Sequence, residues 1–227
     1  MRSRNVEVVA IVRRLRYHRP PGGLRTFAEA TPKLQLDEWQ YRAARGCCIL
    51  GTWNDVDITS AIPALASHAT NATSWGLEPF MWGLVYSGPK GLSIVTNLLA
   101  HATSPQVREE AARSLWITPK VRTPETANAL LSATKDVDAN VRVTAILSLQ
   151  SLLRQKGLDT IIVPGAILGL QDTNSEVRRW TIELLANYRS APGVSAALSN
   201  LLSDPVPDVR SRAEAVLQPT GSEGRQH

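Results

Sequence analysis

The clearest pattern along the chain is a set of apolar residues that lie four positions apart. After an Asp-rich turn, the stretch VRVTAILSL places Val141, Ala145 and Leu149 at steps of four. The same steps recur from Val107 to Leu115 and from Val209 to Leu217. Residues three or four apart share one face of an α-helix. Each stretch therefore predicts an amphipathic helix whose apolar stripe faces a core.

These helices belong to a repeat. The motif recurs as SPQVREEAARSL, DANVRVTAILSL, NSEVRRWTIELL and VPDVRSRAEAVL. When the copies are aligned on their valine, weaker copies place Trp39 and Ser74 in this valine column. The column then occurs six times, 32 to 36 residues apart. Each unit has an apolar first helix, a short turn containing Asp, Asn, Ser or Pro, and the second helix that starts near Val-Arg. This predicts an all-α solenoid of about six antiparallel two-helix repeats.

The motif turn-Val-Arg-x-x-Ala-x-x-x-Leu resembles the HEAT repeat, and in particular the phycobilisome-lyase-type HEAT-like repeat. The resemblance covers residues 22–218, with divergent copies over 22–88 and regular copies over 89–218. It implies a right-handed superhelix in which the second helices line the inner, concave face. HEAT solenoids serve as scaffolds in many unrelated assemblies, so the resemblance indicates the fold more strongly than the function.

The arginine that follows each valine has a structural interpretation. In HEAT-like arrays such an arginine typically meets a turn aspartate of an adjacent repeat, and the resemblance implies the same pairing here. Binding of an anionic ligand by the four arginines is the alternative. The expected ladder consists of Arg108, Arg142, Arg178 and Arg210, with Asp136, Asp138, Asp172, Asp204 and Asp208 as the available partners.

The upstream copies depart from the pattern, and departures from a consensus are where function is expected. The arginine column holds Gln40 in the first unit and Trp75 in the second, and Glu78 occupies the alanine position. Pro79 follows it. Because proline lacks an amide hydrogen, this helix is expected to start late, with Pro79 in its first turn.

The divergent region is also rich in aromatic residues: seven of the twelve in the chain lie between positions 39 and 86. Trp39 falls in the valine column and Trp82 in the leucine column, so both are expected in the core. Trp75 and Phe80 fall outside the core columns and are candidate surface contacts, because large aromatic side chains anchor interfaces. Bulky residues that fill gaps in an irregular repeat are the alternative explanation.

With the motif's valine position counted as one, positions four and seven of the second helices would point toward the concave face. They are mixed in charge and include a tryptophan, which favours a protein or peptide partner over a polyanion. The row is Arg42, Arg45, Glu110, Arg113, Thr144, Leu147, Trp180, Glu183 and Arg212. The candidate binding residues are Arg42, Arg45, Trp75, Phe80, Arg113 and Trp180.

The net charge of +5 is concentrated at the N-terminus. Residues 1–25 contain seven arginines and one glutamate, whereas the rest of the chain has 18 basic and 19 acidic residues. Residues 1–21 are therefore expected to form a basic arm or capping helix, and residues 219–227 a flexible tail. The arm could contact nucleic-acid phosphates. A neutral solenoid argues against that alternative, because a basic stripe along the groove would be expected.

Composition favours a protein of a reducing compartment. No apolar run approaches the roughly 20 residues that a membrane-spanning helix needs. The two cysteines, Cys47 and Cys48, are adjacent and offer no disulfide framework, so a cytoplasmic location is expected. Glu7 interrupts the N-terminal apolar run, which argues against a secretory signal. An organelle presequence would also be Arg-rich, so that alternative stays open.

The sequence contains none of the common catalytic motifs. The four histidines have no metal-binding spacing, and no phosphate loop or nucleophile elbow occurs, so neither a metal nor a cofactor is expected. The leading hypothesis is a non-catalytic scaffold or adaptor that binds a protein partner. The alternatives are a nucleic-acid-binding HEAT-like protein that uses the Arg-rich N-terminus and, implied by the resemblance, a bilin-lyase-type HEAT subunit.

Overall fold

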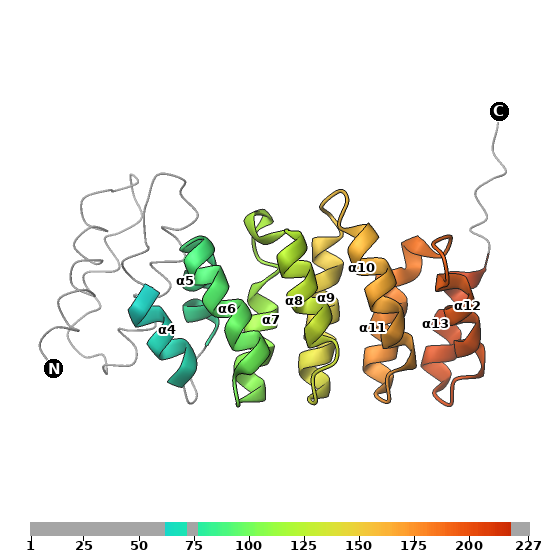
Figure 1. Cartoon of the computed structure of the whole chain (residues 1–227). Coiled ribbons are helices and arrows are strands. Elements are labelled where there is room, and N and C mark those ends of the chain that lie inside the picture. Colours follow the sequence, from blue (N-terminus) through green and yellow to red (C-terminus); the bar gives the residue numbers. More distant parts are fainter. Residues whose placement is uncertain (1–61, 72–76, 219–227) are drawn as a thin grey trace, which may run out of the picture. The chain divides into compact units, whose positions relative to one another are not determined.

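The computed structural model describes residues 62–71 and 77–218 of the 227-residue chain (Figure 1). Every regular element among these residues is a helix. The chain divides into two compact units, Met1–Ser114 and Leu115–His227. The first expected repeat and the departure at Trp75 lie outside the described residues.

The described part of the first unit consists of two stacked helix pairs. The first pair is α4 (Ile62–Asn71) with α5 (Glu78–Tyr86), and the second is α6 (Pro89–His101) with α7 (Pro105–Ser114). Consecutive helices pack against each other, and α5 also contacts α7, the second helix of the next pair. This is the packing expected of stacked two-helix repeats.

Helix α5 begins at Glu78 and has Pro79 in its first turn, which confirms the late start expected from the sequence. Its core residues correct two other predictions. Phe80 is only 5% exposed, so it is not a surface contact. Leu84 is fully buried, whereas Trp82 is partly exposed. The sequence alignment was therefore two residues out of register here, because an irregular repeat lacks the Val-Arg pair that marks the column.

The described part of the second unit, residues 115–218, contains three helix pairs. The first helices are α8, α10 and α12, and the second helices are α9, α11 and α13, which form a row because α11 contacts both α9 and α13. The bounds are α8 Pro124–Ala133, α9 Ala139–Leu152, α10 Asp159–Ala166, α11 Ser175–Leu185, α12 Val194–Asn200 and α13 Pro207–Leu217. Short 3₁₀ helices are η2 (Pro119–Val121), η3 (Ile167–Gln171), η4 (Ala186–Tyr188) and η5 (Leu201–Ser203).

The turn inside each of these repeats supplies the start of the second helix. The Asp138 carboxylate accepts two amide hydrogens of the first turn of α9, with donor–acceptor distances of 2.8 and 3.3 Å. Asn174 caps α11 in the same way at 2.8 and 3.3 Å. Helix α13 has no side-chain cap and begins instead with Pro207, whose missing amide hydrogen needs no partner there.

The core of the second unit follows the steps of four. Val141, Ala145 and Leu149 of α9 are fully buried, as the sequence pattern predicts. The residue that directly follows the motif's alanine position is a buried isoleucine in α9 and α11, but it is the exposed Glu214 in α13. Leu217 is also partly exposed. The last repeat therefore has a polar outer face, which a terminal repeat needs in water.

The fold is thus an all-α repeat solenoid, as the sequence predicts. The described residues contain no strand. Within them, no helix has the length and apolar character to cross a bilayer. The handedness of the superhelix and the total of about six repeats stay predictions.

Candidate functional site

The arginine ladder joins consecutive turns of the second unit. Arg142, at the start of α9, donates from Nε and Nη2 to the two carboxylate oxygens of Asp172 at 2.7 and 2.8 Å. Its Nη1 donates to the carbonyl oxygens of Asp136 and Val137 in its own turn at 2.9 and 3.3 Å. The Asp172 carboxylate also accepts the amide hydrogen of Asn174 at 2.8 Å. One guanidinium therefore ties together two turns that belong to neighbouring repeats.

The next pair, Arg178 and Asp204, repeats this geometry with less exposure to solvent. Arg178 donates to both oxygens of Asp204 at 2.7 and 2.8 Å, and both side chains are less than 10% exposed. Asp204 also accepts the amide hydrogen of Val206 at 2.9 Å. The hydrogen bonds from Arg178 hold the pKa of Asp204 below its usual value, although burial acts in the opposite direction. Such two-pronged charge-assisted bonds are among the stronger polar contacts in proteins.

The other two arginines of the ladder also donate hydrogen bonds to carbonyl oxygens of their own turns. Arg108 and Arg210 each donate Nη1 to two carbonyl oxygens of their own turns, at 2.7 and 3.2 Å and at 2.6 and 3.2 Å. All four guanidiniums therefore lie over their turns in one orientation. In Arg142 and Arg178 protein oxygens occupy Nε, Nη1 and Nη2. These two have few donors left for an anionic ligand, which favours the structural interpretation.

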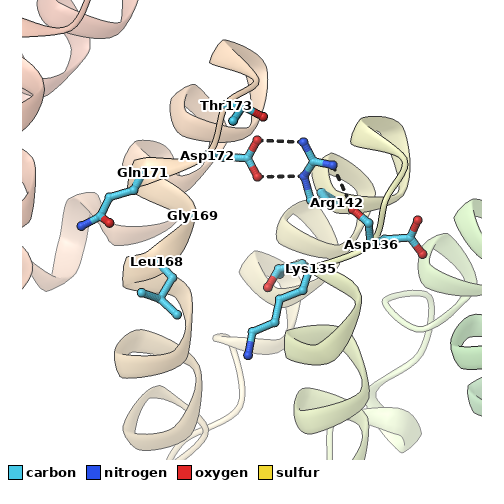
Figure 2. A pocket seen from close by; sticks show the side chains of 9 residues that line it. Lys135, Asp136, Arg142, Leu168, Gly169, Gln171, Asp172 and Thr173 are labelled. Atoms are coloured by element: carbon cyan, nitrogen blue, oxygen red, sulfur yellow. Dashed lines mark hydrogen bonds and ion pairs between the residues drawn. The ribbon is translucent and has the colours of Figure 1, made fainter.

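A pocket of about 360 Å³ lies between the two turns that Arg142 joins. In Figure 2 the Arg142–Asp172 pair forms one side of it, and Lys135 and Leu168 lie on neighbouring elements below that pair. Leu168 is 62% exposed, which is high for a leucine. The pocket thus offers one apolar and one cationic side chain beside an ion pair that is already complete.

A second feature is the row of second helices in the second unit. We call its partly exposed residues the second-helix surface; they are Val143, Leu147, Arg179, Trp180, Glu183 and Arg212. Trp180 lies at the centre of the row, on α11. The guanidinium of Arg179 stands 4.8 Å from the centroid of the Trp180 ring. Arg179 also pairs with Glu176, so the face of the indole carries a cation whose charge is balanced.

A charge network connects α11 to α13 on this surface. Arg212 pairs with Glu183 across the two helices and with Asp208 at 3.1 Å on its own helix. Asp208 and then Glu183 raise the pKa of Arg212, which keeps it charged. Counted from the motif valine of each helix as position one, Glu183 is at position seven of α11 and Arg212 is at position four of α13. Leu147 of α9 and Trp180 of α11 occupy the same two motif positions, and both are partly exposed, so the row has apolar residues beside a paired ionic flank.

In the first unit, α7 carries a different cluster. Arg113 is exposed and pairs with Glu109 and, at 3.2 Å, with Glu110. The second carboxylate oxygen of Glu110 is buried without a hydrogen-bond partner, as is the Nε1 of Trp82 on α5. Burial raises the pKa of Glu110 to about 7; nearby Glu78 and Glu109 add to this effect, and Arg113 opposes it.

These positions decide which of the candidate residues belong to a surface. Arg113 is exposed in the first unit, and Trp180 is partly exposed in the second. Phe80 is buried and is withdrawn as a contact residue. Sequence reasoning missed Arg179, although the sequence RRW at 178–180 places a cation beside the tryptophan. The remaining candidates, Arg42, Arg45 and Trp75, lie outside the described residues.

The chemistry of these surfaces is that of paired charges and apolar anchors. Within the part of the chain that the structure describes, no group of three or more His, Cys, Asp and Glu side chains is arranged to hold a metal ion. The carboxylates named above pair with arginines or cap helices. The arrangement is therefore suited to holding another molecule by contact.

Comparison with known proteins agrees with the architecture. A family model described as HEAT repeats matches residues 92–161, which run from α6 into α10. Residues 92–161 therefore resemble HEAT repeats in sequence. No curated protein matches the chain in sequence. The narrower assignment to the phycobilisome-lyase type stays a prediction.

Solved structures of engineered and designed proteins resemble this chain in fold. An engineered protein of the Northeast Structural Genomics Consortium is 20% identical, with a TM-score of 0.51 over 79% of this chain and 89% of the other. A designed armadillo repeat protein in complex with the peptide (KR)4 is 16% identical, with a TM-score of 0.53 over 82% and 94%. A second designed armadillo repeat protein is 17% identical, with a TM-score of 0.50 over 86% and 98%. At these identities the likeness concerns the fold alone.

Proposed function

We propose that this HEAT-repeat protein is a non-catalytic scaffold that binds a protein partner through the second-helix surface. The observation that carries the proposal is the environment of Trp180. Its indole is partly exposed on the middle one of three adjacent helices, with the Arg179 guanidinium over its ring, and Leu147 of the neighbouring α9 is also partly exposed. Repeat solenoids commonly present such extended helix rows to other proteins.

The distribution of charge on this surface supports a protein ligand. An apolar centre with a polar rim is the usual anatomy of a protein interface, and Trp and Arg are the residues most enriched at its energetic centre. Arg212 is already paired with Glu183 and Asp208, so the rim carries both signs of charge. A partner segment with one bulky apolar side chain and flanking polar residues fits this pattern better than a uniformly charged polymer.

The form of the ligand is proposed from the fold. One designed armadillo repeat protein of similar architecture was solved with a bound peptide, (KR)4. That ligand belongs to the designed protein, but it supports a peptide segment as the form in which a stacked-helix surface takes a partner. Arg113 of the first unit is proposed as a further polar contact, because it is exposed beside two glutamates. Arg42, Arg45 and Trp75 remain proposed contacts on the sequence pattern alone.

Affinity capture with matched tryptophan variants tests the proposal. Wild-type protein, Trp180→Ala and Trp116→Ala would be used as bait in native extract treated with nuclease. Trp116 is the control because it is an exposed tryptophan, 46% accessible, that lies outside the second-helix surface. We expect at least one protein to be retained by wild type and Trp116→Ala and lost with Trp180→Ala, since removing a central aromatic anchor weakens binding by about 2 kcal/mol or more.

A quantitative step follows from the capture. The retained partner would be titrated against wild type, Trp180→Ala and Leu147→Ala, with circular dichroism to verify that each variant keeps its helices. Loss of affinity with both variants supports the surface. If Trp180→Ala keeps every captured protein at wild-type affinity, the second-helix surface is not the binding site.

A further inference from the structure

The loops that precede the three first helices of the second unit, α8, α10 and α12, carry charge of a single sign. These loops are residues 115–123, 153–158 and 186–193, and we call them the loop edge. They contain five basic residues and no aspartate or glutamate. The five are Lys120, Arg122, Arg154, Lys156 and Arg189. The turns inside the repeats differ, because they hold the aspartates of the ladder.

The three loops lie on one side of the unit. In Figure 1 the loops that join repeats of the second unit run along the upper edge, and the turns within repeats run along the lower edge. Helix α8 contacts α10, and α12 contacts η3, so the loops before these first helices follow one another along the stack. Neighbouring packed helices lie about 8–10 Å apart. The basic residues therefore form a line of charge along the edge.

Most of this charge is accessible. Lys120, Arg154 and Lys156 are exposed, and Arg122 is partly exposed. The Nε of Arg122 is buried without a hydrogen-bond partner. Arg189 is partly committed, since it donates to the carbonyl oxygen of Gln218 at 3.1 Å. The edge can thus contribute at least three free-standing cations to a ligand.

Two acidic residues flank the edge at the starts of helices. Glu125 lies in the first turn of α8, and Asp159 opens α10. A carboxylate at a helix N-terminus interacts with the positive end of the helix dipole. Glu125 is further held by its own amide and by the hydroxyl of Thr123, which lower its pKa. With five basic side chains against two acidic ones, the edge keeps an excess of positive charge.

An exposed aromatic side chain accompanies these cations. Trp116, in the first of the three loops, is 46% exposed. An indole ring at a protein surface can stack on a flat aromatic ligand, and base–aromatic stacking is worth about 1–3 kcal/mol per base. Cations that follow a line, together with a stacking ring, are the two components of surfaces that hold single-stranded nucleic acid.

We propose that the loop edge binds single-stranded nucleic acid, with its phosphates on Lys120, Arg154 and Lys156 and a base stacked on Trp116. A duplex fits less well, because its bases are stacked on one another and offer no free face to the indole. An acidic protein segment would match the charge, but a segment made of acidic residues has no flat aromatic group to stack on the Trp116 indole. This surface differs from the second-helix surface, so the edge and a protein partner can be occupied independently.

Fluorescence anisotropy with the full chain tests the proposal. The probe is a labelled oligothymidylate, compared with a labelled duplex of the same length and with labelled polyglutamate. The test variants are Lys120→Glu/Arg154→Glu/Lys156→Glu and Trp116→Ala. Lys135→Glu is the matched control, because Lys135 is an exposed lysine in a turn inside a repeat. Circular dichroism and thermal unfolding verify that every variant keeps the wild-type fold.

Wild type is expected to bind the oligothymidylate more tightly than the duplex or polyglutamate. The triple variant is expected to bind at least tenfold more weakly and to lower the slope of log affinity against log salt by about 2, since each phosphate contact on a single strand contributes about 0.7. Trp116→Ala is expected to lose about tenfold in affinity with little change in slope. Lys135→Glu is expected to bind like wild type.

The Arg-rich arm needs a separate variant, because it carries seven arginines within residues 1–25. A chain with these arginines changed to glutamine should still bind and should still respond to the triple substitution. The proposal is overturned by no binding at low salt, by a triple variant that binds like wild type, or by equal weakening in Lys135→Glu. Equal or tighter binding of the duplex or of polyglutamate would also overturn it, as would complete loss of binding with the arm variant.

Discussion

Asp204 in the second unit and Glu110 in the first unit are both largely buried carboxylates beside an arginine, yet their pKa values shift in opposite directions. The pKa of Asp204 is lowered, chiefly by the hydrogen bonds from Arg178. The pKa of Glu110 is raised to about 7, chiefly by burial. Both side chains lie in stacked two-helix repeats, so the difference comes from their partners and not from the fold.

The two carboxylates differ in how many of their oxygens are satisfied. Each oxygen of Asp204 receives a guanidinium hydrogen, and one also accepts the amide hydrogen of Val206. Glu110 meets Arg113 through one oxygen, and its other oxygen is buried without a partner. An unsatisfied buried polar group costs about 1–3 kcal/mol. The comparison teaches that a regular turn completes the hydrogen bonding of its carboxylate, whereas the neighbourhood of the irregular α5 does not.

The largest effect is expected from removing the carboxylate of the ladder. Asp204→Ala leaves Arg178 buried without its counter-charge, and breaking a buried pair in this way costs about 3–5 kcal/mol. Urea unfolding followed by circular dichroism measures the change. Asp208→Ala is the control, because Asp208 is exposed and its pair with Arg212 should be worth less than about 1 kcal/mol. Equal losses in the two variants would remove the distinction between ladder and surface pairs.

The core provides the next test, because an inner repeat is covered on both sides and the last one is not. Leu149→Ala in α9 removes a fully buried side chain and should lower the free energy of unfolding by about 2–5 kcal/mol. Leu217→Ala in α13 should cost less, since Leu217 is partly exposed. The same urea series measures both. Equal losses at the two sites would contradict a linear stack with an uncovered end.

Glu110→Gln should stabilise the protein in a pH-dependent way. The pKa of Glu110 in the folded state lies above its ordinary value, so its favourable contribution is complete below about pH 4.5 and is lost as the pH rises through 7. The variant has no charge to bury and should therefore gain about 1–2 kcal/mol over wild type at about pH 8 and little at about pH 5. Thermal unfolding across this range measures the gain.

The control for this variant is Glu109→Gln, which removes a neighbouring carboxylate that also pairs with Arg113. It should leave most of the pH dependence in place. A wild-type stability that is flat between about pH 5 and pH 8 would mean that Glu110 is solvated in solution.

The smallest effect is expected at the last rung of the ladder. Arg210 donates to two carbonyl oxygens of its own turn. Among the described residues, no carboxylate accepts hydrogen bonds from both its Nε and its Nη2. Arg210→Ala should therefore lower the free energy of unfolding by only about 1 kcal/mol, because both bonds come from one partly exposed Nη1 group and water can replace them. Arg178→Ala in the same urea series should lose several times more. A loss at Arg210 as large as that at Arg178 would show that the fork to an aspartate adds nothing.

The regular part of the fold could be predicted from the sequence because its signals are local. Steps of four at Val141, Ala145 and Leu149 fix the buried face of α9, and Asp138 marks the start of that helix. The late start of α5 followed from the covalent chemistry of Pro79. Its register did not follow, because the neighbours that bury Phe80 and Leu84 are contributed by other helices.

The surfaces were harder to predict for the same reason. The sequence indicates that Arg142 and Arg178 should meet turn aspartates, but only the packing of repeats decides that these are Asp172 and Asp204. The stacking of Arg179 on Trp180 depends on rotamers that no pattern encodes. A line of basic loops also becomes visible only when residues more than thirty positions apart are brought to one edge.

The central claim is that consecutive repeats are held together by arginine–aspartate pairs between their turns. A double-mutant cycle on Arg178 and Asp204 tests it most directly, with the free energy of unfolding measured for wild type, Arg178→Ala, Asp204→Ala and the double variant. The account predicts a coupling energy of about 2 kcal/mol or more, so that the second substitution costs little once the first is made. Losses that add within about 0.3 kcal/mol would contradict it.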